Sequence, residues 1–315
     1  MKILITGIHG FVGSNLVASL KESHTIYGLD IVAPIKDGLT FTFGWDDLEQ
    51  GKIPQVDAII HLAGKAHDTK NQADAEVYFK VNRDLTIKVF DYFCTHPNIK
   101  KFVFFSTAKA AADKVDGILT EDVKPAPVGP YGESKIVAEK YILNTMGYRP
   151  GEFTDRGVYI LRPCMIHGPG NKGNLNLMYN VVKKGIPWPL GAFENRRIFT
   201  SIDNLSFVIS GLLTKDVPSG IYNMGDDEPV STNELVELIA ESLGKKAHIW
   251  KLPKGFMNGV AKVGGWLHLP LDPERLRKLT ENYISSNAKI KAALGIERMP
   301  VRAVDGLRRT LESFR

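Results

Sequence analysis

Cysteine is scarce in this chain, and long apolar runs are missing. Only Cys94 and Cys164 occur among its 315 residues, without partners at metal-ligand spacing. This usage excludes a disulfide scaffold, predicts no metal site and is typical of the reducing cytoplasm. No apolar run approaches the ~20 residues of a membrane span, so we expect no membrane partner. The segment from Gly255 to Leu271 is the most apolar, but Lys262 and His268 interrupt it, which favours a surface helix.

Charge of one sign is not concentrated anywhere. The formal net charge is +5, but lysine and arginine are scattered and form no run. We therefore expect no nucleic-acid partner, although a mild positive excess suits small anionic ligands such as nucleotides. Hydrophobic residues at 43% and charged residues at 24% are typical of a globular protein. The length allows one large domain or two unequal ones.

Short apolar runs alternate with longer amphipathic stretches in the first half of the chain. The predicted strands are Lys2–Thr6, Thr25–Asp30, Ala58–Leu62, Phe102–Ser106 and Val158–Arg162. The predicted helices are Phe11–Lys21, Ala73–Phe93 and Gly132–Met146. Strands without polar alternation, separated by helices, are typical of a parallel sheet covered on both faces. The pattern predicts an α/β protein with a doubly wound Rossmann sheet.

The texture changes after Arg162, where glycine, proline and asparagine become frequent. Such segments indicate loops, and Thr232 then opens a clear helix. We predict a Rossmann domain over residues 1–165, to which the chain returns at about 196–224. Residues 166–195 and 225–315 are expected to form a smaller, mixed α/β substrate lobe.

Three glycines, Gly7, Gly10 and Gly13, lie between the first strand and the first helix. Glycines here permit a tight turn and close approach of the backbone to a pyrophosphate. The N–H groups of the first helical turn, at Phe11–Val12, would face the phosphates. Asp30 ends the second strand, where a carboxylate accepts both ribose hydroxyls and repels a 2′-phosphate, which favours NAD over NADP. The alternative is that Asp30 caps the next loop.

Tyr131 and Lys135 stand four residues apart at the start of a predicted helix, so their side chains share a face. A phenol titrates near ~10 and is a poor base at neutral pH. A charge ~6 Å away, at an effective dielectric of ~20, contributes about 3 kcal/mol, so Lys135 could lower the pKa of Tyr131. Tyr131 would then exchange a proton with a substrate hydroxyl. Taken alone, this spacing usually indicates a surface pair, but its position after the strands of a nucleotide-binding fold favours catalysis.

Eight short motifs in register resemble the extended short-chain dehydrogenase/reductase family, in its NAD-dependent epimerase/dehydratase branch. They are Gly7/Gly10/Gly13, Asp30, His61-Leu62-Ala63-Gly64, Val81-Asn82, Ser106-Thr107, Tyr131/Lys135, Arg162-Pro163 and His167-Gly168-Pro169-Gly170. The resemblance covers nearly the whole chain. It implies a nucleotide-sugar substrate oxidised at C4 by tightly held NAD, and homodimers formed through the helices predicted at 73–93 and 132–146.

The resemblance also implies roles for single residues. Thr107 matches the catalytic Ser/Thr that bonds the reacting hydroxyl, beside Tyr131 and Lys135. Cofactor contacts are implied for Leu62, Ala63, Gly64, Lys65, Asn82 and Pro163. Substrate contacts are implied for Asn176, Leu177, Arg197, and Arg275 or Arg277, with the nucleotide base near Trp188-Pro189-Leu190. For each residue of the lobe, a plain surface or core role is the alternative.

The sequence departs from the family pattern directly after Thr107. The 4,6-dehydratases carry Asp-Glu there, whereas this chain has Ala108-Lys109, which excludes a dehydratase. The Val-Tyr-Gly usual in 4-epimerases is replaced by Lys109-Ala110-Ala111-Ala112. Lys109, together with Lys65-Ala66-His67, resembles a bacterial branch of surface-polysaccharide enzymes thought to reduce UDP-4-keto-6-deoxy-N-acetylhexosamines. Lys109 and His67 could both approach the substrate.

Three functions therefore remain. We expect a UDP-hexose 4-epimerase of surface polysaccharide synthesis, acting on UDP-glucose or a UDP-N-acetylhexosamine. Asp30 favours it, because free-standing reductases more often use NADPH. Lys109 favours the alternative, a UDP-4-keto-6-deoxy-N-acetylhexosamine 4-reductase. The third is a non-catalytic NAD-binding regulatory protein, from which loss of Tyr131 or Lys135 would be expected.

Overall fold

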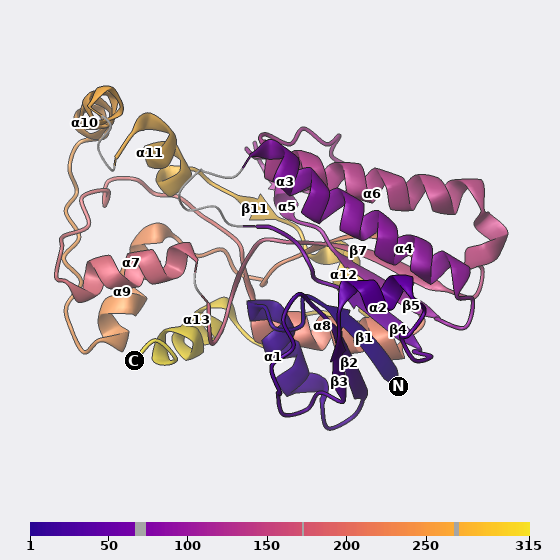
Figure 1. The fold of residues 1–315 in the computed structure, drawn as a ribbon. Coiled ribbons are helices and arrows are strands. Elements are labelled where there is room, and N and C mark those ends of the chain that lie inside the picture. Colours follow the sequence, from indigo (N-terminus) through magenta and orange to yellow (C-terminus); the bar gives the residue numbers. More distant parts are fainter. Residues whose placement is uncertain (67–73, 172, 268–270) are drawn as a thin grey trace.

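A seven-stranded parallel sheet forms the centre of the computed structural model, which describes residues 1–66, 74–171, 173–267 and 271–315 (Figure 1). The strand order is β10-β7-β5-β4-β1-β2-β3. The strands are β1 (Lys2–Thr6), β2 (Thr25–Leu29), β3 (Phe41–Phe43), β4 (Ala58–His61), β5 (Lys101–Phe105), β7 (Gly157–Pro163) and β10 (Gly220–Met224). The sequence predicts five of these strands, whereas β3 is short and half-exposed and β10 follows the loop-rich segment.

Helices cover both faces of this sheet. One face is covered by α1 (Phe11–Leu20), α8 (Ile202–Thr214) and α12 (Ala288–Leu294). The other face is covered by α2 (Trp45–Glu49), α4 (Leu85–Thr95) and α6 (Pro130–Tyr148). Strands β1, β4, β5 and β7 are buried almost throughout, which explains their unbroken apolar sequences. The predicted doubly wound α/β fold is confirmed.

The helix predicted over Ala73–Phe93 is interrupted. It consists of α3 (Ala75–Phe79), one π-helical turn η1 (Lys80–Asp84) and α4. The wider turn contains Asn82, which is fully buried. π-Helical turns insert a residue without breaking the apolar stripe, so hydrophobic spacing does not reveal them.

Several short elements surround the carboxyl ends of the sheet strands. Two small parallel pairs join β8 (Met165–His167) with β9 (Phe199–Ser201), and β6 (Ile118–Leu119) with β11 (Ile284–Ser285). Helix α5 (Ala108–Ala111) follows β5, and a 3-10 turn η2 (Pro150–Phe153) follows α6. These crossings bring residues of the C-terminal third beside the sheet.

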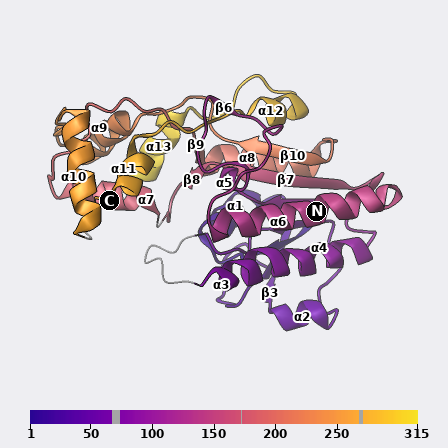
Figure 2. The same ribbon diagram turned by 90° about the horizontal axis from the view of Figure 1, so that it is seen from above.

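A second group of helices lies to one side of the sheet (Figure 2). Helices α7 (Asn174–Lys183), α9 (Thr232–Ser242) and α13 (Ala303–Glu312) share one apolar core. Helices α10 (Lys254–Trp266) and α11 (Pro273–Thr280) pack together beyond it. Ser231 and Glu234 form a capping box that starts α9, at the predicted position. The 225–315 range also supplies α12 to the sheet, so the division into domains stays a prediction.

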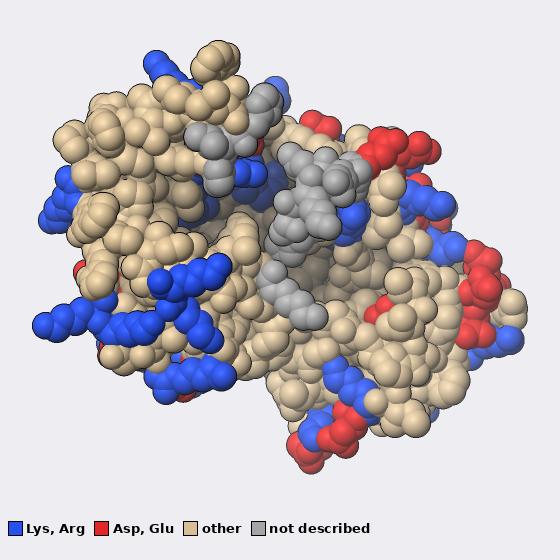
Figure 3. Space-filling model, turned by 60° about the vertical axis from the view of Figure 1, so that its left-hand side comes forward, with Lys and Arg blue, Asp and Glu red and all other residues tan. Residues whose placement is uncertain are grey.

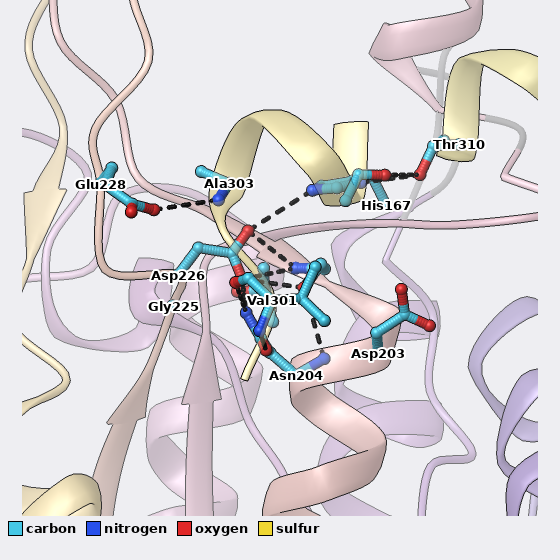
Figure 4. Close-up of polar contacts among 12 residues, drawn as sticks. His167, Asp203, Asn204, Gly225, Asp226, Glu228, Val301, Ala303 and Thr310 are labelled. Atoms are coloured by element: carbon cyan, nitrogen blue, oxygen red, sulfur yellow. Dashed lines mark hydrogen bonds and ion pairs between the residues drawn. The ribbon is translucent and has the colours of Figure 1, made fainter. Parts of the chain in front are cut away.

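A buried polar network ties α13 to the sheet domain (Figure 4). Nδ1 of His167 lies 2.8 Å from the Thr310 hydroxyl of α13, and its Nε2 lies 3.6 Å from the Asp226 carboxylate. Asp226 accepts hydrogen bonds from the backbone N–H and hydroxyl of Ser201 and from the Asn204 amide. Since unpaired polar groups are costly in a core, this network fixes the position of α13.

Within the described ranges, no helix is both long and apolar enough to cross a membrane.

Candidate active site

The turn between β1 and α1 is shaped by its glycines. Gly7 has a φ of +65°, and a Cβ there would lie 2.9 Å from Cα of Ala63. A Cβ on Gly13 would lie 2.5 Å from the carbonyl oxygen of Ile8. Gly10 begins α1 without a side-chain cap, which leaves the N–H groups at Phe11 and Val12 available to a ligand. The cradle therefore fits the pyrophosphate of a dinucleotide.

Asp30 follows β2 beside this turn. Its carboxylate accepts hydrogen bonds from the backbone N–H groups of His9, at 3.0 Å, and Ile31, at 2.7 Å. Burial lowers the pKa of His9 against the opposing effect of Asp30, so the carboxylate faces a largely neutral imidazole. Asp30 is thus held where the sequence predicts a ribose acceptor.

Sequence reasoning missed Lys36, which lies over the same turn. Its ammonium donates a hydrogen bond to the Ser14 hydroxyl in α1, at 2.5 Å, and burial lowers its pKa. Lys36 is a cation at the entrance to the phosphate cradle. No spacing rule signals it, because it belongs to an irregular loop.

The loop after β4 lies against the π-helical turn and α6. The Asn82 amide accepts from the backbone N–H of Lys65 and donates to its carbonyl and to the Ser134 hydroxyl. A Cβ on Gly64 would lie 3.1 Å from Nζ of Lys135. The predicted cofactor residues of the Leu62–Lys65 loop are therefore adjacent to Lys135. His67 lies outside the described residues.

Thr107, Tyr131 and Lys135 converge at the carboxyl end of β5. They are together called the catalytic corner, after the role that the sequence predicts for them. Thr107 caps α5, and its hydroxyl is hydrogen-bonded with the Tyr131 phenol from the first turn of α6. Lys135 is buried one turn further along α6, and its ammonium donates to the carbonyl of Phe105, at 2.8 Å. Gly132 allows α6 to approach α5 closely, since a Cβ there would lie 2.7 Å from the Lys109 carbonyl oxygen.

Burial dominates the electrostatics of this corner. It raises the pKa of Tyr131, and Tyr78 raises it further, while the Thr107 hydrogen bond lowers it. Burial also lowers the pKa of Lys135 to about 7, against the opposing effect of Glu139. The sequence predicts that Lys135 lowers the pKa of Tyr131, but Lys135 is not among the groups that shift it here, and the loss of hydration raises it. Tyr131 therefore stays protonated at neutral pH.

Glu139, Arg162 and Ser106 form a buried network directly beneath Lys135. The Arg162 guanidinium donates to both carboxylate oxygens of Glu139, with 2.5 Å between Nη2 and Oε2. The Ser106 hydroxyl donates to the same carboxylate. The network fixes β7, which ends at Pro163, against α6. Sequence reasoning gave Glu139 no role, although it follows Lys135 by one helical turn.

A second polar cluster joins the site to the lobe. Lys109 donates to Asp113 at 2.6 Å, and Arg277 of α11 donates to the other oxygen of that carboxylate at 2.9 Å. Arg277 also pairs with Glu281, at 2.9 Å. Arg197 donates to the carbonyl of Lys278, and burial lowers the pKa of its guanidinium. Lys109, Arg197 and Arg277, distant in sequence, are thus gathered beside the catalytic corner.

The remaining predicted lobe residues lie elsewhere. Arg275 is on the solvent side of α11, 3.5 Å from Asp272. Leu177 is 58% exposed on α7, and Oδ1 of Asn176 is buried without a described hydrogen-bond partner. Nε1 of Trp188 is buried and, within the described chain, equally unpaired. Figure 3 shows the surface hollowed between the lobe and the sheet domain. Substrate roles for these residues stay predictions.

A glycine cradle, a carboxylate directly after β2 and a Thr-Tyr-Lys corner on one parallel sheet are typical of a dinucleotide-dependent oxidoreductase of the short-chain type. More narrowly, the chain belongs to the NAD-dependent epimerase/dehydratase family, whose sequence model matches residues 3–225.

Known proteins resemble the chain over most of its length. The UDP-glucose 4-epimerase of Vibrio cholerae is 32% identical over 269 residues, which cover 80% of this chain and 78% of that protein. The GDP-6-deoxy-D-mannose reductase of Pseudomonas aeruginosa is 25% identical over 313 residues, 93% of this chain and 91% of the relative. The structure of the Thermus thermophilus UDP-glucose 4-epimerase with NAD superposes with a TM-score of 0.75 at 23% identity, covering 100% of this chain and 99% of that one.

Family membership confirms three expectations. The chain is an enzyme, its cofactor is NAD, and its family acts on nucleotide sugars. The third alternative, a non-catalytic regulatory protein, is therefore wrong. The glycine cradle and Asp30 are the parts of the described chain that fit this cofactor.

Proposed function

We propose that the protein is a UDP-hexose 4-epimerase of surface polysaccharide synthesis, acting on UDP-glucose or a UDP-N-acetylhexosamine. The observation that carries this proposal is the hydrogen-bonded pair of Thr107 and Tyr131 near Lys135, with Asp30 three strands away on the same carboxyl edge of the sheet. The V. cholerae relative, a UDP-glucose 4-epimerase, supports the choice of reaction and nucleotide. We further propose that the enzyme works in the cytoplasm as a homodimer formed through α3, α4 and α6.

Each catalytic side chain has a distinct task in this proposal. Bound NAD supplies the hydride acceptor and a positive charge. Tyr131 removes the proton of the sugar C4 hydroxyl and later returns it, while Thr107 holds that oxygen in line. Lys135, fixed by the Phe105 carbonyl, holds the nicotinamide ribose and stabilises the phenolate. The proton that Tyr131 removes during oxidation of the sugar is the one that it returns during reduction, so the epimerase needs no further acid.

In this proposal, the cations beside Thr107, Tyr131 and Lys135 bind the substrate diphosphate. Arg277 shares the Asp113 carboxylate with Lys109, Arg197 donates to the Lys278 carbonyl of the same helix α11, and a diphosphate accepts bidentate hydrogen bonds from such guanidinium groups. Asn176 and Leu177 remain proposed contacts from the lobe, and of the two arginines that the sequence leaves open, Arg275 and Arg277, we propose Arg277 as the phosphate contact. The unpaired Nε1 of Trp188 would meet the nucleotide base.

One observation favours the second function, reduction of a UDP-4-keto-6-deoxy-N-acetylhexosamine. Lys109 occupies the position two residues after Thr107, and its ammonium and the Arg277 guanidinium both bond the Asp113 carboxylate. A cation there could bind an N-acetyl carbonyl or a keto oxygen. The P. aeruginosa relative, a GDP-6-deoxy-D-mannose reductase, carries out chemistry of that kind.

A substrate panel separates the two functions. Purified protein is incubated with UDP-glucose, UDP-N-acetylglucosamine or UDP-4-keto-6-deoxy-N-acetylglucosamine, each with NADH, NADPH or neither. We expect the first two sugars to equilibrate with their C4 epimers without net oxidation of added cofactor, and the purified protein to absorb in the nicotinamide band. Stoichiometric oxidation of NADH by the keto sugar, with no epimer formed from the others, would establish the reductase instead.

A further inference from the structure

The outer end of the lobe exposes an apolar stripe on α10. The stripe consists of Phe256, Val260, Val263 and Leu267. These positions follow the spacing i, i+4, i+7 and i+11, so they share one side of the helix. Phe256 is 59% exposed, Leu267 51%, and the adjacent Trp266 81%. The packed side of the helix is formed by other residues, Met257, Ala261 and Gly264. Nothing in the described ranges covers the stripe.

Positive charge predominates in the sequence around this stripe, while the carboxylates of the adjacent helix α11, Asp272 and Glu274, pair with Arg275 and Lys278. Between Leu243 and Leu271 the sequence contains five lysines and no acidic residue. The lysines are Lys245, Lys246, Lys251, Lys254 and Lys262. Lys183 and Lys184 at the end of α7 add to them, since the Lys245 ammonium donates to the Lys183 carbonyl, at 2.8 Å. Figure 3, which turns the lobe forward, shows much blue and little red over it. The α10 stripe, Trp266 and these seven lysines together are called the basic–apolar face.

The segment before α10 is held against the end of α7. The backbone N–H of Trp188 donates to the His248 carbonyl, at 2.7 Å, and the backbone N–H of Trp250 donates to the Trp188 carbonyl, at 2.8 Å. A cavity of about 280 Å³ opens between Ile186, Lys245 and Lys246. Cations beside an apolar hollow can hold a phosphate and the first carbons attached to it. The segment that leads into α10 therefore lies beside the end of α7.

We propose that the basic–apolar face docks on an anionic lipid bilayer, with α10 lying in the plane of the interface. The stripe would enter the boundary between head groups and acyl chains, and the lysines would lie over the lipid phosphates. The sequence-based expectation of no membrane partner concerned spanning segments; an interfacial helix needs only one apolar side. Trp266 and Trp250, exposed at 81% and 55%, are side chains favoured at that depth.

Charge selects the bilayer over a second copy of this chain. Two basic–apolar faces packed against each other would bring lysines together, because 243–271 has no carboxylate and those of α11, Asp272 and Glu274, already pair with Arg275 and Lys278. An anionic surface meets the same lysines with complementary charge. Helix α10 also contains four glycines, Gly255, Gly259, Gly264 and Gly265, which weaken an isolated helix in water. Burial of the stripe at an interface would stabilise it.

Vesicle binding tests this proposal without any sugar substrate. The full-length protein is sedimented with vesicles of phosphatidylcholine alone or mixed with phosphatidylglycerol. We expect binding to the mixed vesicles only, weakening with added salt, together with a blue shift of tryptophan emission. The variant Phe256→Ser/Val263→Ser should lose the blue shift. The variant Lys251→Gln/Lys254→Gln/Lys262→Gln should partition about a hundredfold less.

Matched variants on the sheet domain control for loss of exposed apolar or basic groups. Ile118→Ser/Tyr148→Ser removes exposed apolar side chains, and Lys52→Gln/Lys100→Gln/Lys114→Gln removes exposed lysines. Both should bind vesicles as the wild type does. All four variants should keep the wild-type unfolding temperature. Equal binding to neutral vesicles, or unchanged binding by the α10 variants, would overturn the proposal. If the α10 variants instead shift the sedimentation coefficient without vesicles, the face is a self-interface and the proposal also fails.

Discussion

The catalytic corner and the cluster of cations beside it differ in how the chain builds them. Thr107, Tyr131 and Lys135 come from one strand end and one helix start, and Lys135 is almost completely buried. Lys109, Arg197 and Arg277 come from three distant segments, and the side chains of Lys109 and Arg277 are 33% and 38% exposed. The corner is a rigid part of the sheet domain, whereas the cluster depends on where the lobe places its helices.

This difference explains why the fold indicates the type of reaction but not the identity of the substrate. A parallel sheet fixes its strand ends, so the residues proposed to move protons can be predicted from their position in the fold. The proposed sugar and nucleotide contacts lie on loops and helix ends, whose side chains the sheet does not position. Mutations in the corner should therefore abolish turnover, while mutations in the cluster should change affinity.

The largest effect is expected in the corner itself. Tyr131→Phe removes only the phenolic oxygen, so turnover should fall about a thousandfold while NAD binding persists. Turnover is measured with the substrate identified by the panel, and cofactor retention by absorbance. Tyr141→Phe, on the same helix but hydrogen-bonded to Asp91 at the surface, is the control and should keep activity. Wild-type activity in Tyr131→Phe would remove the catalytic assignment.

A large effect on stability is expected beneath the corner. Glu139→Gln leaves the Arg162 guanidinium charged and buried without its carboxylate, which should lower the free energy of unfolding by about 3 kcal/mol. Asp155→Asn breaks the exposed pair with Lys100 and should cost far less. Urea denaturation of both variants gives the comparison. If the two losses were equal, the buried network would not stabilise the domain in the way its geometry indicates.

A pH-dependent effect, small near neutral pH, is expected from His61. Its ring lies between the Thr6 and Thr86 hydroxyls, and burial lowers its pKa from 6.5 to about 3. Between those values the unfolded chain binds a proton that the folded chain does not. Stability should therefore fall as the pH drops from 6.5 towards 3, by at most about 1.4 kcal/mol per pH unit.

The slope is read from urea unfolding at several pH values. His61→Gln should flatten it relative to the wild type, whatever its effect at neutral pH. His96→Gln removes a histidine from the exposed end of α4 and should leave the slope unchanged. A slope that stays the same in His61→Gln would mean that His61 titrates normally in the folded protein.

Sequence and structure agree best where local chemistry determines the backbone. Gly7, Asp30 and Tyr131 can be assigned because strand, turn and helix follow one another directly, and each lies where expected. Glu139 and Lys36 escape sequence reasoning because their partners, Arg162 and Ser14, become neighbours only through tertiary packing. Hydrophobic spacing does not show the π-helical turn at Asn82 either, and the raised pKa of Tyr131 depends on burial that no motif encodes.

The smallest expected effect separates two arginines of α11. The sequence leaves Arg275 and Arg277 as alternatives for the substrate phosphate; Arg277 shares the Asp113 carboxylate with Lys109, whereas Arg275 lies 3.5 Å from Asp272 on its own helix. Arg277→Ala should raise KM about tenfold through a lost charge-assisted hydrogen bond, with kcat nearly unchanged. Arg275→Ala, on the solvent side of the same helix, is the matched control and should change KM little. A larger rise in KM for Arg275→Ala than for Arg277→Ala would contradict this assignment. It would indicate that α11 rotates when the substrate binds and that Arg277 contacts Asp113 only in the unbound protein.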